Sequence, residues 1–333
     1  MGSTLSLLIS IIIFFLTSIQ LRAQEVYTKK FSKMGSDFEV TVVADTPEEG
    51  TSFINLAINE IERIERLISS WDANSQTSLI NKNAGKQTVA VSLELFKLIE
   101  RSVNISKITD GAFDITYASM DAIWKFDGSM SNMPSPEKIK ASVSRVGYQN
   151  LKLNSNDTTV FLSRKGMKIG FGAIGKGYAA DMAKQLLQSK GVVAGIINAS
   201  GDMNAWGKPP NAKNWQVAIT NPMDTSKAYA ILPLYNQAVV TSGNYEKFVS
   251  FNNKRYTHII DPRTGYPASG ILSVTVFAPK AELADALATS IFVMGVSLGV
   301  DRVDQLPGVE CIIIDEKGSV ITSKNLKIKK DNQ

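Results

Sequence analysis

Between residues 215 and 278 the chain contains a run of short strand patterns without helical patterns between them. Neighbouring parallel strands need a crossover of a dozen or more residues, usually a helix, whereas antiparallel strands can be joined by a turn. This run therefore predicts a mainly antiparallel sheet and argues against a doubly wound parallel fold. Branched and aromatic residues indicate strands at 215–220, 228–232, 238–241, 255–260 and 272–278.

Helical patterns occur before and after this run. Thr46 is followed by Pro47 and two acidic residues, which is typical of a helix start, and apolar residues then recur at spacings of three and four up to Ile68. Further helices are expected at 92–107, at 177–190 before Gly191, and at 281–294. Other strands are expected at 38–43, 159–162, 166–169, 192–198, 309–315 and 319–323. Together these patterns predict an α+β fold, a mixed and mainly antiparallel sheet with packed helices.

The N-terminus carries an apolar run at residues 5–19, followed by polar Gln20 and a plausible cleavage site ending at Ala23. A run of this length favours a signal peptide over residues 1–23, with an uncleaved membrane anchor as the alternative. We therefore expect an exported protein that is periplasmic or associated with the inner membrane. No linker or composition step interrupts residues 24–333, so one mature domain is the simplest interpretation.

The charge and cysteine content exclude several classes of protein. The formal net charge of +5 is mild and the basic residues are scattered, so the basic C-terminal tail is interpreted as a solvated end and no nucleic-acid partner is expected. The single cysteine, Cys311, cannot form an intramolecular disulfide. It lies within the apolar segment 309–314, which predicts a core residue and not a nucleophile.

The helix expected at 281–294 places Asp285 and Thr289 one turn apart on the same face. A carboxylate and a hydroxyl at this spacing offer two hard oxygens to one cation, and Mg²⁺ takes few protein ligands when substrate phosphates complete its shell. In the alternative interpretation, Thr289 bonds back to a helical carbonyl while Asp285 caps a helix or faces solvent. The spacing alone leaves both interpretations open.

Three further segments offer candidate groups for chemistry. The glycine-rich stretch 170–177 with Lys176 precedes a helix and could bring backbone amides to a phosphate, or it could be a turn required for packing. His258 is the only histidine and hence the obvious proton acceptor near neutral pH, although a lone histidine is often structural. Aromatic residues at Trp71 and Phe113 could hold a flat ring or anchor the core.

Taken in order, these segments resemble the motifs of the ApbE family, the FAD:protein FMN transferases. The resemblance covers nearly all of the chain after the leader. The matching segments are Met34-Gly35-Ser36, Ser70-Trp71, Thr109-Asp110-Gly111-Ala112-Phe113-Asp114-Ile115-Thr116, 172–181, Asn198-Ala199-Ser200-Gly201-Asp202, Thr241-Ser242-Gly243-Asn244-Tyr245, 258–265 and Ala284-Asp285-Ala286-Leu287-Ala288-Thr289.

The resemblance implies an α+β, T-fold-like domain and assigns roles to the matching positions. Residues expected to contact FAD are Met34, Trp71, Ala112, Phe113, Asp114, Gly170, Lys176 and Ile260. Mg²⁺ would be held by Asp285, Thr289 and the main-chain carbonyl of Ala173. Gly170 departs from the pattern, because many relatives carry an aspartate there that touches FAD.

The implied reaction is the Mg²⁺-dependent transfer of FMN from FAD to a serine or threonine of an acceptor protein, with release of AMP. The resemblance implies an exported or membrane redox protein with an Asp-x-x-(Ser/Thr)-Gly-Ala-(Ser/Thr) segment as the acceptor, and either peripheral or anchored membrane association of the enzyme. His258 is the expected base, and Asp285 the essential acid that holds the metal. The alternatives are an FAD pyrophosphatase that yields FMN and AMP, and a non-enzymatic flavin-binding or trafficking protein.

Overall fold

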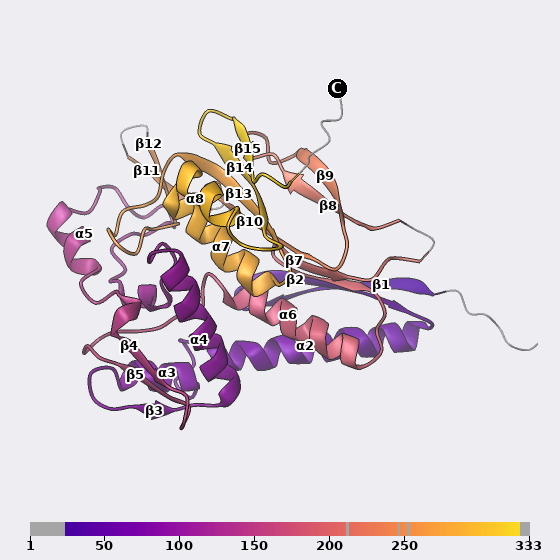
Figure 1. The fold of residues 1–333 in the computed structure, drawn as a ribbon, viewed down its shortest axis with the longest axis horizontal. Coiled ribbons are helices and arrows are strands. Elements are labelled where there is room, and N and C mark those ends of the chain that lie inside the picture. The colour runs from indigo at the N-terminus through magenta and orange to yellow at the C-terminus, as the bar shows by residue number, and fades with distance from the viewer. Residues whose placement is uncertain (1–23, 211–212, 246, 252–253, 327–333) are drawn as a thin grey trace, which may run out of the picture.

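The computed structural model describes residues 24–210, 213–245, 247–251 and 254–326 (Figure 1). The expected signal peptide, 1–23, lies outside the described residues. The strands are β1 (Glu25–Lys33), β2 (Ser36–Ala44), β3 (Val89–Ala90), β4 (Leu151–Asn154), β5 (Thr159–Leu162), β6 (Gly195–Ala199), β7 (Asp202–Trp206), β8 (Trp215–Thr220), β9 (Ala228–Leu234), β10 (Ala238–Gly243), β11 (Phe248–Phe251), β12 (Lys254–Thr257), β13 (Ile271–Ala278), β14 (Glu310–Asp315) and β15 (Val320–Thr322). The helices are α2 (Pro47–Ile68), α3 (Gln76–Lys82), α4 (Leu93–Ile108), α5 (Pro136–Ser142), α6 (Gly175–Ser189), α7 (Ala281–Met294) and α8 (Val296–Val303), with 3₁₀ turns η1 (Ile115–Ser119) and η2 (Tyr148–Asn150).

The main sheet has eight strands in the order β1-β2-β6-β7-β10-β13-β14-β15. Each neighbouring pair in it is antiparallel. Smaller antiparallel sheets are formed by β3-β5-β4, β8-β9 and β11-β12. The expected α+β class with a mainly antiparallel sheet is therefore confirmed.

Helices α2, α6 and α7 cover one face of the main sheet, and the β8–β9 hairpin covers part of the other (Figure 1). Successive residues of a strand point to opposite faces, so one strand contributes side chains to the core under the helices and to the core under the hairpin. In β14, Cys311 and Ile313 pack under α7, whereas Ile312 packs with Trp215 of the hairpin. Burial also raises the pKa of the Cys311 thiol to about 12, which agrees with the expected core role.

Helix α2 begins and ends where the sequence predicts. The Thr46 side chain accepts a hydrogen bond from the Glu49 amide at 3.1 Å, and Pro47 occupies the first turn. The apolar stripe is buried against the sheet, with Ile54, Ile61 and Ile64 at its centre. Helix α2 is therefore held by its cap and by the burial of one face.

Helices α6 and α7 cap each other. The α7 N-terminus has no cap from its own neighbours, and Asp181 of α6 instead accepts hydrogen bonds from the amides of Ala281 (2.8 Å) and Glu282 (3.1 Å). Conversely, Asp285 of α7 accepts a bond from the amide of Gly177 in the first turn of α6, at 3.2 Å. Burial raises the pKa of Asp181 to about 6 despite its hydrogen bonds.

The strand expected at 166–169 is wrong. Gly166 has a φ of +82°, and side chains take up the hydrogen bonds that a neighbouring strand would make. Asn81 bonds both the amide (2.8 Å) and the carbonyl (3.1 Å) of Ile169, and the Ser119 hydroxyl does the same for Lys168 at 2.7 and 2.9 Å. The alternation of apolar residues reflects the burial of Met167 and Ile169 without a ladder.

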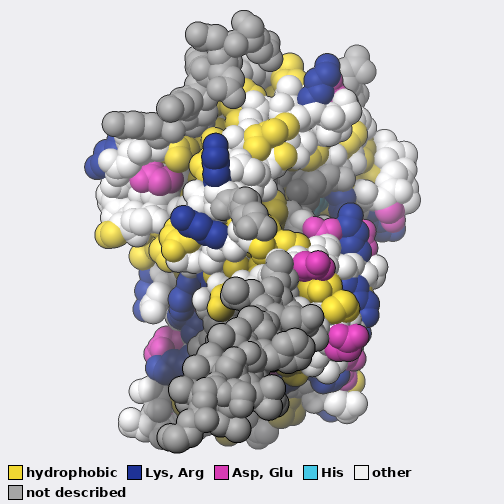
Figure 2. Space-filling model, turned by 90° about the vertical axis from the view of Figure 1, so that its right-hand side faces the viewer, with side chains coloured by type: hydrophobic (Ala, Val, Ile, Leu, Met, Phe, Trp, Pro, Cys, Tyr) yellow, Lys and Arg dark blue, Asp and Glu magenta, His cyan; other side chains and the backbone are white. Residues whose placement is uncertain are grey.

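On the face that Figure 2 shows, the described residues form no patch of a single charge. Basic side chains there stand apart, with acidic and apolar ones between them. Within the described ranges no helix combines the length and the apolar composition needed to cross a membrane.

We predict that Gly177→Ala lowers the free energy of unfolding by about 1–3 kcal/mol, the usual range for overpacking. An added Cβ would lie 2.3 Å from the Ala281 carbonyl oxygen, so α6 and α7 would have to separate. Urea denaturation followed by circular dichroism measures the change. Gln185→Ala, at an exposed position of the same helix, should shift stability by less than about 0.5 kcal/mol. Equal midpoints for the two variants would contradict the predicted role of this close approach.

Candidate functional site

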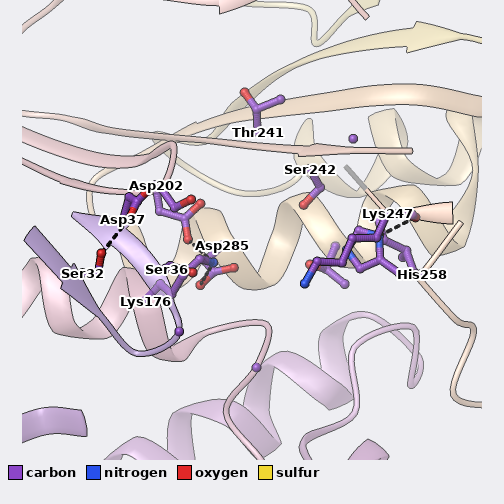
Figure 3. Close-up of a pocket in the computed structure, with 16 residues that line it drawn as sticks. Ser32, Ser36, Asp37, Lys176, Asp202, Thr241, Ser242, Lys247, His258 and Asp285 are labelled. Carbon is purple, nitrogen blue, oxygen red and sulfur yellow. Dashed lines mark hydrogen bonds and ion pairs between the residues drawn. The ribbon is translucent and has the colours of Figure 1, made fainter. Parts of the chain in front are cut away.

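A cavity of about 700 Å³ lies where the β1–β2 turn, the start of α6, β10 and α7 meet. A smaller cavity of about 160 Å³ shares Gly172, His258, Ile259 and Thr289 with it, so the two form one continuous site. The large cavity is lined by Ser32, Gly35, Ser36, Asp37, Gly172, Lys176, Ser200, Asp202, Thr241, Ser242, Gly243, Lys247, His258, Ile259, Asp285 and Thr289 (Figure 3). Segments far apart in the sequence therefore converge here.

Asp285 lines the large cavity and is only 4% exposed. The Lys176 ammonium lies 3.9 Å from its carboxylate, and the Gly177 amide donates to it. Burial raises the pKa of Asp285, and the charge of Lys176 opposes this shift. Asp285 therefore does cap a helix, because it accepts from an amide in the first turn of α6. The same carboxylate also faces the cavity.

Asp202 is a site residue whose role the sequence did not reveal. Its carboxylate lies 2.6 Å from the Lys176 ammonium, which also lies 3.9 Å from Asp285. A two-residue turn between β6 and β7, with positive φ at Ser200 (+57°) and Gly201 (+99°), places it there. The Asn198 side chain holds this turn by accepting from the Gly201 amide at 2.8 Å. The sequence feature that could have indicated this role is the Asn-Ala-Ser-Gly-Asp segment that ends at Asp202.

The acidic end of the cavity fits a divalent cation. Asp202 and Asp285 both lie within 4 Å of the Lys176 ammonium, so two acidic groups meet here, and a bound divalent cation would offset their negative charge. Across the described part of the chain no cluster of three or more His, Cys, Asp or Glu side chains is arranged to hold a metal. Hydroxyl, carbonyl and phosphate oxygens would complete the shell, as Mg²⁺ prefers, and Thr289 and Ala173 both line the smaller cavity.

His258 lines both cavities and follows directly after β12. Its Nδ1 lies 3.1 Å from the Lys247 carbonyl oxygen, which can only accept a hydrogen bond. Nδ1 therefore carries the proton in the neutral ring, and Nε2 provides the basic lone pair. In Figure 3, His258 and Lys247 lie at the opposite end of the cavity from Lys176, Asp202 and Asp285.

Four predicted FAD-contact residues line the smaller cavity: Ala112, Phe113, Asp114 and Ile260. Asp114 also organises its own loop, because its carboxylate accepts from Thr116 at 2.7 Å and from the Tyr148 amide at 2.9 Å. Burial nevertheless raises the pKa of Asp114.

The other predicted FAD contacts, apart from Lys176, do not line either cavity. Met34 precedes the lining residue Gly35 and donates its amide to Glu65 at 2.8 Å. Trp71, in the loop between α2 and α3, is 95% exposed. Gly170 is buried, and a Cβ there would lie 2.9 Å from the Ala118 Cβ, so this backbone has little room for an aspartate. Contacts of these three residues with FAD stay predictions.

Comparisons with known proteins identify relatives of this chain. A FAD:protein FMN transferase of Klebsiella pneumoniae (strain 342) is 31% identical over 271 residues, which cover 81% of this chain and 84% of that relative. A FAD:protein FMN transferase of Treponema pallidum (strain Nichols) is 30% identical over 280 residues, or 78% of this chain and 77% of the relative. The crystal structure of the ApbE protein of Thermotoga maritima is similar with a TM-score of 0.81 at 31% identity, covering 90% of this chain and 97% of that one.

The family match extends over most of the chain. The sequence model described as the ApbE family matches residues 34–313, a range that includes the cavity residues from Gly35 to Thr289. The resemblance inferred from the ordered motifs is thereby confirmed, and this chain belongs to the ApbE family.

Proposed function

We propose that this chain transfers the FMN half of FAD to a serine or threonine hydroxyl of an acceptor protein. The hydroxyl oxygen bonds to the FMN phosphorus, the bond from that phosphorus to the bridging oxygen breaks, and AMP leaves with that oxygen. The hydroxyl proton passes to a base. The observation that carries the proposal is the group of Lys176, Asp202 and Asp285 in a cavity that also contains His258.

The acidic end of the cavity is suited to the diphosphate of FAD. Lys176 provides a cation for phosphate oxygens, and its ion pair with Asp202 holds the ammonium inside the cavity. Asp285, Thr289 and the main-chain carbonyl of Ala173 are the proposed ligands of Mg²⁺. When bound, Mg²⁺ would neutralise the charge on the phosphates as the bond breaks.

His258 is the proposed base for the acceptor hydroxyl. The Lys247 carbonyl fixes the ring with Nδ1 protonated, so Nε2 can take the proton. Asp285 is a poorer choice of base, because a carboxylate that holds a metal binds protons weakly. The smaller cavity, with Phe113 and Ile260 in its lining, offers apolar surface to a ring of FAD.

Two alternatives use the same cavity. Water in place of the acceptor hydroxyl would make the enzyme an FAD pyrophosphatase, and binding without turnover would make it a flavin carrier. A carrier has no need of two buried acidic groups next to a lysine, because they cost desolvation energy without assisting binding of an anionic ligand. This arrangement therefore favours a reacting site.

We predict that incubation with FAD, Mg²⁺ and an acceptor carrying the Asp-x-x-(Ser/Thr)-Gly-Ala-(Ser/Thr) segment adds the mass of phosphoester-linked FMN to the acceptor and releases AMP. Mass spectrometry of the acceptor and chromatography of nucleotides measure both products. Asp285→Ala should reduce the transfer rate at least ~100-fold, because an electrostatic group at the reacting centre is lost. Free FMN alone would indicate hydrolysis, and neither product would indicate a carrier.

We also predict that His258→Ala slows transfer by about 10²–10⁴-fold, the usual contribution of a general base, while FAD binding stays close to that of the parent protein. Stopped-flow transfer rates and FAD titration separate the two effects. A variant with the full transfer rate at neutral pH would rule out His258 as the base.

Export is proposed on the apolar run at residues 5–19 and places the reaction in the periplasm or at the inner membrane. Mass spectrometry of the protein recovered from cell fractions should find a chain that starts at residue 24. An intact chain in the membrane fraction would favour an anchor, and an intact chain in the cytoplasm would refute export.

A further inference from the structure

The β11–β12 hairpin presents three exposed residues on one side, close to the large cavity. Its register pairs Ser250 with Arg255 and Phe248 with Thr257, so these four residues share that side, and Thr257 at its base is buried. The opposite side packs into the protein, because Val249 and Tyr256 belong to the cluster around Trp124. Phe248, Ser250 and Arg255 are exposed, and we call these three residues the hairpin face.

Arg255 differs from most other arginines of the described chain. The Arg255 guanidinium lies 4.5 Å from the centroid of the Phe248 ring and forms no ion pair with a described carboxylate. Arg164 instead donates to the Ser144 carbonyl. The arginines that do form ion pairs with described carboxylates are Arg63, Arg66, Arg101, Arg145, Arg263 and Arg302.

The hairpin face lies near the part of the site that contains His258. Arg255 precedes His258 by three residues, which is about 10 Å along an extended chain at ~3.3 Å per residue. Lys247 lines the cavity next to Phe248, so positive charge continues from the face to the cavity mouth. Neither Arg255 nor Phe248 lines the cavities assigned to FAD, which leaves this charge without a role in binding the nucleotide.

We propose that the hairpin face binds an acidic segment of the acceptor protein and guides its hydroxyl to His258. An aromatic ring with an arginine stacked on it is a frequent binding hot spot, and the planar guanidinium matches a carboxylate with two parallel hydrogen bonds. The partner's carboxylate would supply the counter-charge that Arg255 does not find among the described residues. This inference rests on the proposed transferase function.

Charge reversal at Arg255 tests the proposal. The probes are a soluble carrier domain fused to an Asp-Ala-Ala-Thr-Gly-Ala-Thr segment, and the same carrier with Asn in place of Asp. We expect Arg255→Glu to raise the KM for the acidic carrier at least about tenfold, because a charged hydrogen-bonding pair becomes a repulsive one. The KM for FAD should not change. With the Asn carrier, the effect of Arg255→Glu should shrink to less than about threefold.

Two further variants make the result specific. Arg164→Glu makes the same charge change at another exposed arginine and should leave both KM values unchanged. Arg255→Gln should give a smaller loss in the same direction, and thermal unfolding of every variant shows whether the fold is kept. An unchanged acceptor KM, an equal loss with both carriers, or a changed KM for FAD would each overturn the proposal. If the parent enzyme binds FAD but modifies neither carrier, the proposed function itself fails, and the docking face with it.

Discussion

The mutual capping of α6 and α7 is the interaction on which the site depends. Asp181 of α6 bonds the first amides of α7, and Asp285 of α7 bonds an amide in the first turn of α6. This exchange requires the two helices to approach closely, and Gly177 allows it because it places no Cβ against the Ala281 carbonyl. Three hydrogen bonds between residues far apart in the sequence thus fix the position of the carboxylate that faces the cavity.

The same contact determines the electrostatics of the site. An acidic group is stabilised near a helix N-terminus, where amides without helical partners point outwards. Asp285 gains this stabilisation from α6 and from Lys176, but it is almost fully buried, and burial still raises its pKa. A nearby Asp202 increases the local negative charge. The fold therefore holds two acidic groups beside Lys176, where they favour a cation.

The sequence pattern alone was sufficient to predict helices whose ends and buried faces are determined by residues within the helix or next to it. Helix α7 spans the residues expected from its apolar periodicity, and α2 begins at the cap residue expected, Thr46. The strand expected at 166–169 failed, because Asn81 and Ser119 satisfy its backbone from other parts of the chain. The short helix α3 was not among the expected helices, because its cap by Ser75 has no long apolar stripe to accompany it.

The site shows the same division between local and distant determinants. The helical spacing of Asp285 and Thr289 could be read from the sequence, since one turn of helix suffices to place both on one face. That Asp202 lies 2.6 Å from Lys176 could not, because the contact joins a turn between two strands to the start of a helix, and no periodicity relates them. The family motifs include both Lys176 and Asp202, but they do not show that the two residues are in contact. The meeting of Lys176 with Asp202 and Asp285 is therefore a property of the tertiary contacts.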